Sequence, residues 1–583
     1  MTDYFEVHDR DGTARLGELR LSDPVTTPVV VDDVLRDGGS RWVGDSEIPT
    51  GDDSALTVLP HRALPGGTPD EVQEAFAVDY PAVEYPSAAV VSPETAKDHG
   101  TDAYVLSTAQ ELAGHARAFV NAMVKTREAI PADTALYLPG VATPTNAAIL
   151  AYAGVDLFDT DQAVLKGTQG KYLTSDGEFF LEDLSELPCA CPACQQSRSA
   201  FGREDCAEHN ERALRAELAR VRERIRAGRL RDYIEGQARH DQWLTATFRR
   251  LDQQYAYLEQ RTPILRNGEL TATTDDSMRR VEIQRFAKRV TERYRCQFDK
   301  PLVLVPCSAR KPYSESQSHG QFHDAIQFRG HLVSMTSPIG VVPQELELTY
   351  PAQHYDSAVT GHWSATEKEF VADVLAAYLE RNDYPRIIAH VAGEGYREIC
   401  ERVSDRLDRS FEYTAVDHPT RTESLSNLAS TLSGESKYRK RERQHNTIRA
   451  IADYQFGEGA GDTIFDDLQV ESRYPKLRAL DSDGEQLAML VPQYGVLALT
   501  IAGGRRWVDS DAPTKRIEID AFVPHGSVLA PGIVDADDDI RVGDDVVIEG
   551  PKAFGVGRAQ MSGPEMVESS RGIASQVRHV EER

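Results

Sequence analysis

The sequence predicts a multidomain α/β protein, and three observations lead to that prediction. The chain has 583 residues, too many for one hydrophobic core and enough for three or four domains. From Ala88 onward, apolar runs of strand length alternate with segments of helical periodicity, which is typical of parallel sheets. The last segment has short strands separated by Gly-Asp turns, which favours a small β-barrel.

The composition is strongly acidic. The formal net charge is −28, from 93 Asp and Glu against 65 Lys and Arg, and the acids are spread along the whole chain. Such a surface repels nucleic acid at low salt, but it is also typical of a protein from a salt-loaded, halophilic cytoplasm, where screening weakens the repulsion. An RNA partner is therefore compatible with the charge, provided that the surface keeps local basic faces.

The lack of a long apolar run, the N-terminal segment and the cysteine spacing predict a cytoplasmic protein. No run of about eighteen apolar residues exists, so we expect no membrane span. The segment Met1–Phe5 has neither a basic nor an apolar leader, and we expect cytoplasmic localisation. Three of the seven cysteines fall within six positions, which indicates a metal site and a reactive thiol and argues against a disulfide framework.

The first part of the chain predicts a parallel α/β unit. After a strand-turn-strand opening over 5–31, residues 32–85 are rich in Gly, Pro and Asp and support no assignment. Strands are expected at 88–91, 103–106, 135–138 and 155–159, and helices at 108–128 and 146–153.

A cysteine cluster follows this unit. Cys189, Cys191 and Cys194 form C-x-C-x-x-C and need a fourth ligand to complete a tetrahedral zinc site. His209 and Cys206 are both candidates. With four protein ligands such a zinc has no open position, so its role is structural.

Two basic stretches stand out in the acidic chain. Residues 210–235 form an Arg-rich helix that either carries ion pairs with its interleaved glutamates or contacts an RNA backbone. The segment 436–443 contains five basic residues and is either a charged helix end or a phosphate site.

A candidate nucleophile follows a buried strand in the second half. The apolar run Leu302–Val305 predicts a strand that ends at Pro306, so Cys307 lies at the carboxyl edge of a sheet, where ligands bind in α/β folds. Arg310, Lys311, Tyr313 and His319 follow closely; cations favour a thiolate, and an imidazole can move its protons. The alternative is a buried, inert thiol beside a polar loop.

The motif around this thiol resembles a known family. Read as P-C-x3-K-P-Y-x2-S-x2-H, it is met by Pro306, Cys307, Lys311, Pro312, Tyr313, Ser316 and His319. This pattern resembles the signature of the archaeosine synthase family, archaeal tRNA-modifying enzymes related to tRNA-guanine transglycosylase. The resemblance implies a transglycosylase-like (β/α)8 barrel with a zinc site, a parallel α/β domain, a small α+β domain and a β-barrel PUA domain. The expected ranges are 1–235 for the barrel with its zinc-binding insertion and 236–298 for a helical linker. Residues 299–455 are expected to form the α/β domain with the Cys307 motif, 456–506 the small α+β domain and 507–583 the PUA domain.

The resemblance also reaches into the barrel. His209, followed by Asn210, resembles the fourth zinc ligand of the family and is preferred to Cys206. The strand ending at Asp159 resembles the strand that carries the transglycosylase nucleophile. The acidic Asp-Ser-Gly-Gly loop that base exchange also needs is missing from the first half of the sequence, so Asp159 is expected to bind substrate at most.

The family resemblance implies a reaction on tRNA. Its substrate is 7-cyano-7-deazaguanine at D-arm position 15, whose nitrile is converted towards the archaeosine amidine by an amine donor: lysine, or glutamine or ammonia. We expect Cys307, Lys311, Ser316 and His319 to be catalytic and Arg310, Tyr313 and Asp159 to bind substrate. Cys307 either adds to the nitrile as a thioimidate or positions a direct amine attack.

The partner protein, the class of function and the assembly each have more than one possibility. If lysine is the donor, the family implies a radical S-adenosylmethionine lyase as partner. A base-exchanging transglycosylase and a non-catalytic tRNA-binding subunit are the alternative functions. A homodimer is one option for the assembly.

Overall fold

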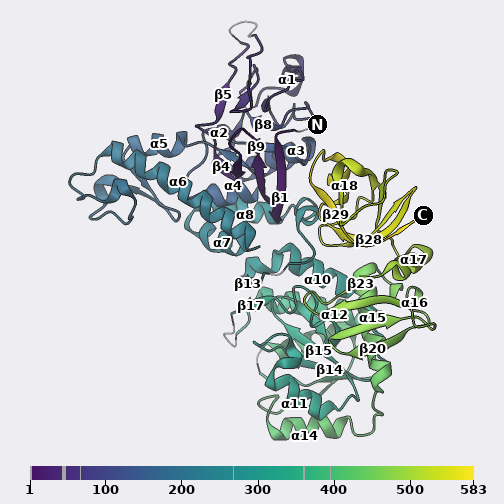
Figure 1. The fold of residues 1–583 in the computed structure, drawn as a ribbon. Coiled ribbons are helices and arrows are strands. Elements are labelled where there is room, and N and C mark those ends of the chain that lie inside the picture. The colour runs from purple at the N-terminus through teal and green to yellow at the C-terminus, as the bar shows by residue number, and fades with distance from the viewer. Residues whose placement is uncertain (1–2, 43–46, 66, 267, 359–361, 394) are drawn as a thin grey trace. The chain divides into compact units, whose positions relative to one another are not determined.

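The computed structural model describes residues 3–42, 47–65, 67–266, 268–358, 362–393 and 395–583 (Figure 1). Met1 and Thr2 of the expected leaderless N-terminus lie outside these residues. The chain divides into two compact units. The first comprises 1–263, 528–541 and 560–574, and the second comprises 264–527, 542–559 and 575–583.

The first unit is built on parallel strands. A three-stranded antiparallel sheet, β1-β2-β3, precedes a seven-stranded sheet with the order β4-β10-β9-β8-β7-β6-β5. In the described part of the chain, neighbouring strands of the larger sheet pair in parallel. The strands are β1 (Phe5–Asp11), β2 (Ala14–Leu19), β3 (Val25–Thr27), β4 (Val29–Val30), β5 (Leu35–Asp37), β6 (Leu56–Val58), β7 (Ser87–Val91), β8 (Ala103–Leu106), β9 (Ala135–Tyr137) and β10 (Leu157–Phe158).

The seven-stranded sheet is curled as a barrel. Strands β4 and β5 lie at its opposite edges, yet only residues 31–34 join them. Four residues span little more than ~14 Å, so the two edges must lie close together. The expected (β/α)8 barrel is therefore found as a curled sheet of seven parallel strands, one fewer than expected, and no strand pairing joins its edges β4 and β5 in the described part of the chain. All four residues of β8 are buried, as expected for strands covered on both faces.

Helices surround this barrel, and one of them differs from the sequence expectation. The helix expected over 108–128 is interrupted at Gly114, whose φ of +87° is left-handed and ends the first helical turn. The helices of this unit are α1 (Asp70–Ala75), α2 (Ala109–Leu112), α3 (Ala116–Ala129), α4 (Ala147–Tyr152), α5 (Asp161–Thr168), α6 (Arg203–Arg226), α7 (Leu230–Gln237), α8 (Gln242–Asp252), α9 (Tyr255–Arg261) and α18 (Gly563–Glu568), with the 3-10 turns η1 (Leu181–Asp183), η2 (Pro192–Cys194) and η3 (Ala238–His240).

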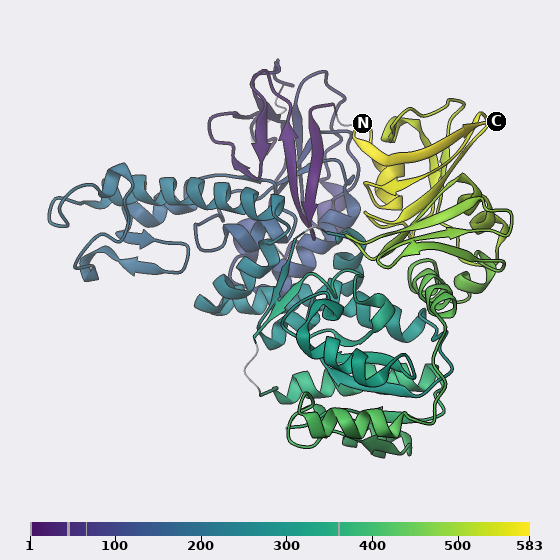
Figure 2. The ribbon, with the colours of Figure 1, turned by 60° about the horizontal axis from the view of Figure 1, so that its bottom comes forward.

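An arm extends from the barrel. The long helix α6, α5 and the hairpin of β11 (Lys171–Leu173) and β12 (Glu178–Phe180) form it (Figure 2). Gly167 of α5 packs directly on α6, since a Cβ there would lie 2.4 Å from the Cα of Ala207. This close approach fixes the arm's two helices against each other.

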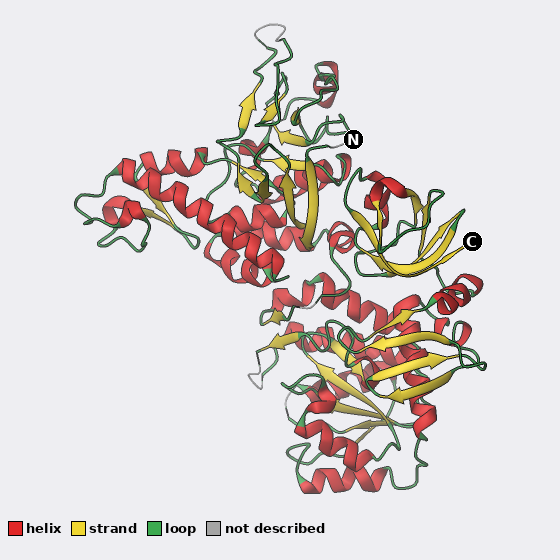
Figure 3. Cartoon of the chain, viewed as in Figure 1, coloured by secondary structure: helices red, strands yellow, loops and turns green. Residues whose placement is uncertain are grey.

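The second unit contains a five-stranded sheet with helices on both faces (Figure 3). Its order is β16-β15-β14-β18-β19, parallel except for β16. Alternate residues of β14 face different cores: Leu302 and Leu304 pack with α12 and α13, and Val303 and Val305 with α11 and α14. The elements are β13 (Leu270–Ala272), η4 (Asp275–Arg279), α10 (Val281–Glu292), β14 (Leu302–Pro306), η5 (Tyr313–Glu315), α11 (Gln317–Ile326), β15 (His331–Thr336), β16 (Gly340–Pro343), η6 (Gln344–Leu346), β17 (Tyr355–Ser357), α12 (Ala365–Arg381), β18 (Ile387–Ala389), α13 (Tyr396–Leu407), β19 (Phe411–Tyr413) and α14 (Thr422–Thr431).

Helix α10 falls within the range expected as a linker, but it contributes Ile283, Phe286 and Val290 to the larger core of this sheet.

A four-stranded antiparallel sheet, β20 to β23, and a six-stranded sheet complete the chain. Their elements are α15 (Lys440–Phe456), α16 (Ala460–Thr463), β20 (Gln469–Arg473), β21 (Lys476–Leu480), β22 (Gln486–Val491), β23 (Val496–Leu499), α17 (Ile501–Asp509), β24 (Arg516–Ile519), β25 (Ser527–Leu529), η7 (Ala530–Gly532), β26 (Ile533–Ala536), β27 (Asp545–Gly550), β28 (Ala553–Ala559) and β29 (Ile573–Glu582).

Among the described residues, no helix has the length and apolar character needed to cross a bilayer.

A buried charged pair joins the first residue of β15 to η6. His331 Nε2 is 3.0 Å from Glu345 Oε2, and His331 Nδ1 is 2.8 Å from the hydroxyl of Tyr384. Burial alone would lower the pKa of His331, but the Glu345 carboxylate outweighs burial and raises it to about 10. The imidazolium therefore donates from both nitrogens.

We predict that this pair makes stability depend on alkaline pH. Because the folded pKa of His331 lies above the unfolded value, its stabilisation is complete below about pH 6.5 and is lost as the pH rises towards 10. The His331→Gln variant, which leaves Glu345 uncompensated, should lose roughly 3–5 kcal/mol. Denaturant unfolding at several pH values measures both effects. A double variant with Glu345→Gln is the control, and an unchanged pH slope in it would refute the assignment.

Candidate active site and metal centre

Cys307 lies at the point where the connections of the five-stranded sheet diverge. It follows β14, which pairs in parallel with β15 on one side and β18 on the other. The chain leaves β14 into α11, which packs on one face, and leaves β18 into α13, which packs on the opposite face. Such a divergence opens a crevice outside the carboxyl ends of the strands, which is where α/β folds bind ligands.

The sulfur of Cys307 is half-buried and has a defined partner. Its backbone N donates to the carbonyl of Met335 at 3.1 Å, and its Sγ lies 3.3 Å from the hydroxyl of Tyr396. Tyr396 is the first residue of α13, so the β18–α13 connection brings this hydroxyl to the sulfur. Burial, and then the charge of Cys307, raises the pKa of Tyr396, which keeps this phenol protonated and able to donate.

Lys311 is the cation of the site. Its Nζ lies 3.9 Å from the ring centroid of Tyr355, a cation–π contact. Burial lowers the pKa of Lys311, and the nearby Cys307 and Asp356 oppose this effect. The Tyr355 hydroxyl is 2.7 Å from that of Tyr313, so both tyrosines are held in place under the ammonium.

His319 and Ser316 are directed into the loop and not towards the sulfur. The Ser316 hydroxyl caps α11 by accepting from the N–H of His319 at 3.2 Å. His319 Nε2 lies 3.1 Å from the carbonyl of Pro306, and its ring stacks on Tyr313. Burial lowers the pKa of His319 to about 4, so the ring is neutral and its Nε2–H donates. In the described residues no hydrogen bond joins His319 to Cys307.

Of the other residues in the motif, Arg310 is exposed and pairs with Glu315 at 3.0 Å, while Tyr313 is buried beside Tyr355. The motif thus brings together Cys307, Lys311 and Tyr313. Sequence reasoning did not assign Tyr396 or Tyr355 to the site, although Tyr355 belongs to a polar His-Tyr-Asp group and Tyr396 follows the glycines after β18.

Asp159 is buried and its carboxylate is occupied. It accepts hydrogen bonds from the Tyr137 hydroxyl at 2.9 Å, from Gly140 N at 2.6 Å and from Asp161 N at 3.0 Å. Burial raises its pKa. With three donors already bound, this carboxylate ties together the ends of β9 and β10.

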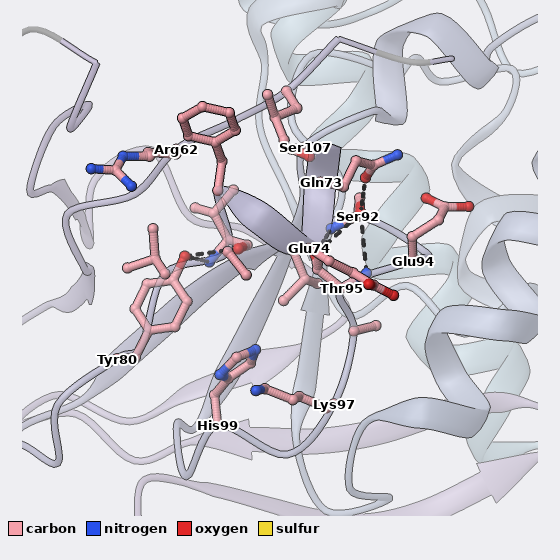
Figure 4. Close-up of a pocket in the computed structure, with 17 residues that line it drawn as sticks. Arg62, Gln73, Glu74, Tyr80, Ser92, Glu94, Thr95, Lys97, His99 and Ser107 are labelled. Atoms are coloured by element: carbon pink, nitrogen blue, oxygen red, sulfur yellow. Dashed lines mark hydrogen bonds between the residues drawn. The ribbon is translucent and has the colours of Figure 1, made fainter. Parts of the chain in front are cut away.

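A cavity of about 280 Å³ opens at the carboxyl ends of β7 and β8 in the barrel (Figure 4). Some of the polar groups lining it are paired with one another. The Ser92 hydroxyl donates to Gln73 Oε1 at 2.6 Å, and the Tyr80 hydroxyl donates to the carbonyl of Val90 at 2.8 Å. Asp159 is not among the residues that line this cavity.

The cysteine cluster forms a candidate metal centre. One ligand atom from each of Cys189, Cys191, Cys194 and His209 lies within 4.8 Å of all the others. The fourth position is therefore supplied by His209. Cys206 lies outside the group, and burial raises the pKa of its thiol to about 11. Three thiols and one imidazole match the ligand set of a closed tetrahedral site.

The surroundings orient the histidine for this role. His209 Nε2 lies 2.8 Å from the carbonyl of Leu173, so the proton is on Nε2 and Nδ1 faces the thiols. Tyr172 stacks on the imidazole with a centroid distance of 3.8 Å. Asn210 accepts from the N–H of Leu173 and donates to the carbonyls of Ala163 and Lys171. These bonds join α6 to the β11–β12 hairpin.

Four segments of the chain match described protein families. Residues 84–242 match "Queuine tRNA-ribosyltransferase", and residues 283–432 match "Domain of unknown function (DUF5591)". Residues 446–513 match "Patch-forming domain C2 of tRNA-guanine transglycosylase", and residues 516–580 match "PUA domain". The Cys307 site therefore lies in a segment whose family description names no function.

Relatives align over the full length. The chain is 66% identical to the archaeosine synthase of Haloferax volcanii and 42% identical to the archaeosine synthase subunit alpha of Methanosarcina acetivorans, in both cases over 100% of each chain. It is 28% identical to the tRNA-guanine(15) transglycosylase of Methanothermobacter thermautotrophicus, over 79% of this chain and 68% of that protein.

We predict that the purified chain binds one metal ion through the cysteine cluster. Cys191→Ala should lose the metal and lower the melting temperature of the arm, because a closed metal site contributes folding energy. Cys206→Ala is the matched control and should retain the metal. Elemental analysis of the wild-type protein and both variants makes the measurement, and metal loss in Cys206→Ala as well as in Cys191→Ala would show that Cys206, not His209, is the fourth ligand.

Proposed function

Because the chain belongs to the archaeosine synthase family, we propose that Cys307 is the nucleophile with which it converts the nitrile of 7-cyano-7-deazaguanine in tRNA. The chain is a tRNA-modifying enzyme of archaeosine formation, and the proposal concerns its chemistry. The observation that supports it best is the contact of the Cys307 sulfur with Tyr396 at the divergence of the strands, beside the ammonium of Lys311.

The first step forms a bond between the sulfur of Cys307 and the nitrile carbon. One π bond of the nitrile breaks, and its electron pair becomes a proton-accepting site on nitrogen. The proton must come from a donor in the crevice. The Tyr396 hydroxyl, 3.3 Å from the Cys307 sulfur, is the donor that we assign to this step. The product is a thioimidate at D-arm position 15.

The second step replaces sulfur by nitrogen. An amine attacks the thioimidate carbon, the carbon–sulfur bond breaks, the thiolate leaves, and the amine nitrogen gives one proton to the Tyr396 oxygen, which restores the hydroxyl. Lys311 stabilises the thiolate before attack and after release, since an ammonium close to the sulfur favours its charged form. Direct amine attack, with Cys307 only positioning the donor, is the alternative order.

The remaining residues of the motif support these steps. Ser316 and His319 hold the loop against Pro306 and so fix the position of Cys307, which makes them positioning residues. Tyr313 orders Tyr355 beneath Lys311. The exposed Arg310 is available to the tRNA backbone. The Asp159 carboxylate would accept hydrogen bonds that hold the ends of β9 and β10 together next to the tRNA.

The nitrogen donor, the metal and the partners are part of the proposal. Lysine, or glutamine or ammonia, supplies the nitrogen, and a lysine adduct would require a radical S-adenosylmethionine lyase to release the amidine. The relative named a subunit alpha supports an assembly with a second protein. The Cys3His set suits a structural Zn²⁺, which would hold the arm and take no part in the reaction.

We predict that Cys307→Ala abolishes conversion of the nitrile while leaving tRNA binding intact. Cyano-modified tRNA is incubated with the protein and each candidate donor, and the nucleosides are analysed by mass. Omitting the donor should trap a covalent protein–tRNA adduct in the wild-type protein only. The matched control is Ser308→Ala, which should keep activity. Normal turnover by Cys307→Ala would end the proposal for this residue.

We also predict that the chain does not exchange bases. Labelled guanine incubated with the protein and unmodified tRNA should not be incorporated, because the carboxylate of Asp159 is occupied and the second acidic loop is missing. Incorporation that disappears in Asp159→Asn would instead support a transglycosylase.

A further inference from the structure

A second cavity lies in the second unit, next to the segment that follows Cys307. It has a volume of about 440 Å³. Its lining comes from five places: the segment from η5 to Phe328, strand β15, the segment from η6 to Glu347, the first turns of α15, and the β20–β21 hairpin. Tyr313, Ser314 and His319 belong to its wall, whereas Cys307 and Lys311 do not. The cavity is therefore distinct from the crevice that holds the sulfur.

Three cations line this cavity without an acidic partner. Lys440, Arg443 and Arg473 are in no ion pair among the described residues, although the chain carries a net charge of −28. By contrast, Arg449 farther along α15 and Arg478 in β21 each lie within 4 Å of a carboxylate. Three cations without ion pairs that line one cavity of so acidic a protein indicate an anion that comes from outside the chain.

Arg443 gives the clearest signal. Its Nε is buried and has no hydrogen-bond acceptor, and burial alone lowers the pKa of its guanidinium. A buried, unpaired donor is costly unless a ligand satisfies it. The guanidinium lies over the ring of Phe328, with 3.6 Å between Cζ and the ring centroid.

Phe328 is held in an unusual conformation for this stacking. It is 43% exposed and has a φ of +61°, and the preceding Gln327 has a φ of +50°. Left-handed backbone is unfavourable for a bulky residue and tends to persist at ligand sites. Tyr474, from the β20–β21 turn, is a second half-exposed aromatic side chain on the cavity wall.

The acidic groups of the cavity are already bound internally. Glu347 accepts from the N–H of Ser314 at 2.8 Å and from the hydroxyl of Tyr474 at 2.9 Å, and Glu345 is paired with His331. Each carboxylate oxygen has a second lone pair. Glu347 can therefore also accept from the N–H groups of a heterocyclic base.

We propose that this cavity holds one unstacked nucleotide of the tRNA substrate, other than the one being modified. Lys440, Arg443 and Arg473 bind its phosphate, the aromatic rings of Phe328 and Tyr474 stack on its base, and Glu347 accepts from the base edge. Cations combined with aromatic platforms are the general means of binding single-stranded nucleotides. The inference rests on the proposed function only in taking tRNA as the substrate.

Equilibrium binding of labelled tRNA tests this site without any turnover. All variants are made in the Cys307→Ala background, so the outcome does not depend on the role of that sulfur. Arg443→Ala should weaken binding about tenfold and reduce the slope of log affinity against log salt by about one. Arg443→Lys keeps the charge but not the planar fork and should recover part of the affinity.

A second variant removes the aromatic platform with little strain. Phe328→Gly suits the left-handed backbone and should weaken tRNA binding about tenfold or more, with no change in the salt slope. Arg441→Ala, on the same helix but outside the cavity lining, is the matched control and should bind normally. Wild-type affinity and salt slope in both Arg443→Ala and Phe328→Gly would overturn the proposal. So would a loss of free amino-acid binding in these variants with unchanged tRNA affinity.

Discussion

The position of β14 between two parallel neighbours is the constraint on which the catalytic half of the molecule depends. Pairing with β15 and β18 buries residues Leu302–Val305, and their alternating side chains supply both cores of the sheet. Pro306 ends the strand, and the half-buried sulfur that follows lies where α11 and α13 depart to opposite faces. The reactive group is thus placed by backbone pairing, and the tyrosines around it only refine its environment.

Local sequence predicted much of this arrangement. The run Leu302–Val305 has the composition of a buried parallel strand, and β14 forms there with one further residue. The spacing of Cys189, Cys191 and Cys194 predicted a shared metal site, because three thiols on one tight turn are typical metal ligands. The choice between His209 and Cys206 was beyond spacing alone, since both lie on α6 and only the orientation of each side chain decides it.

The tertiary environment of the thiol was harder to predict. His319 follows Cys307 by twelve positions, but helix α11 turns its imidazole onto Tyr313 and the carbonyl of Pro306. Tyr396 is far away in sequence and is brought to the sulfur by the β18–α13 connection. Side-chain direction on a helix follows from packing, so closeness in sequence did not imply contact. The barrel shows the same limit: Asp159 was identified by its strand, whereas the donors that occupy its carboxylate come from other segments.

The unequal burial of the three thiols in the cysteine cluster has a consequence for oxidative stress. Cys189 and Cys191 are partly exposed, while Cys194 is buried beneath Tyr172. An oxidant would therefore reach the two outer thiols first. Once they were converted to sulfenic acids, the imidazole of His209 would keep its bond to Leu173 and its contact with Cys194 but lose Cys191, so damage at the exposed thiols would weaken the link between α6 and the cysteine turn.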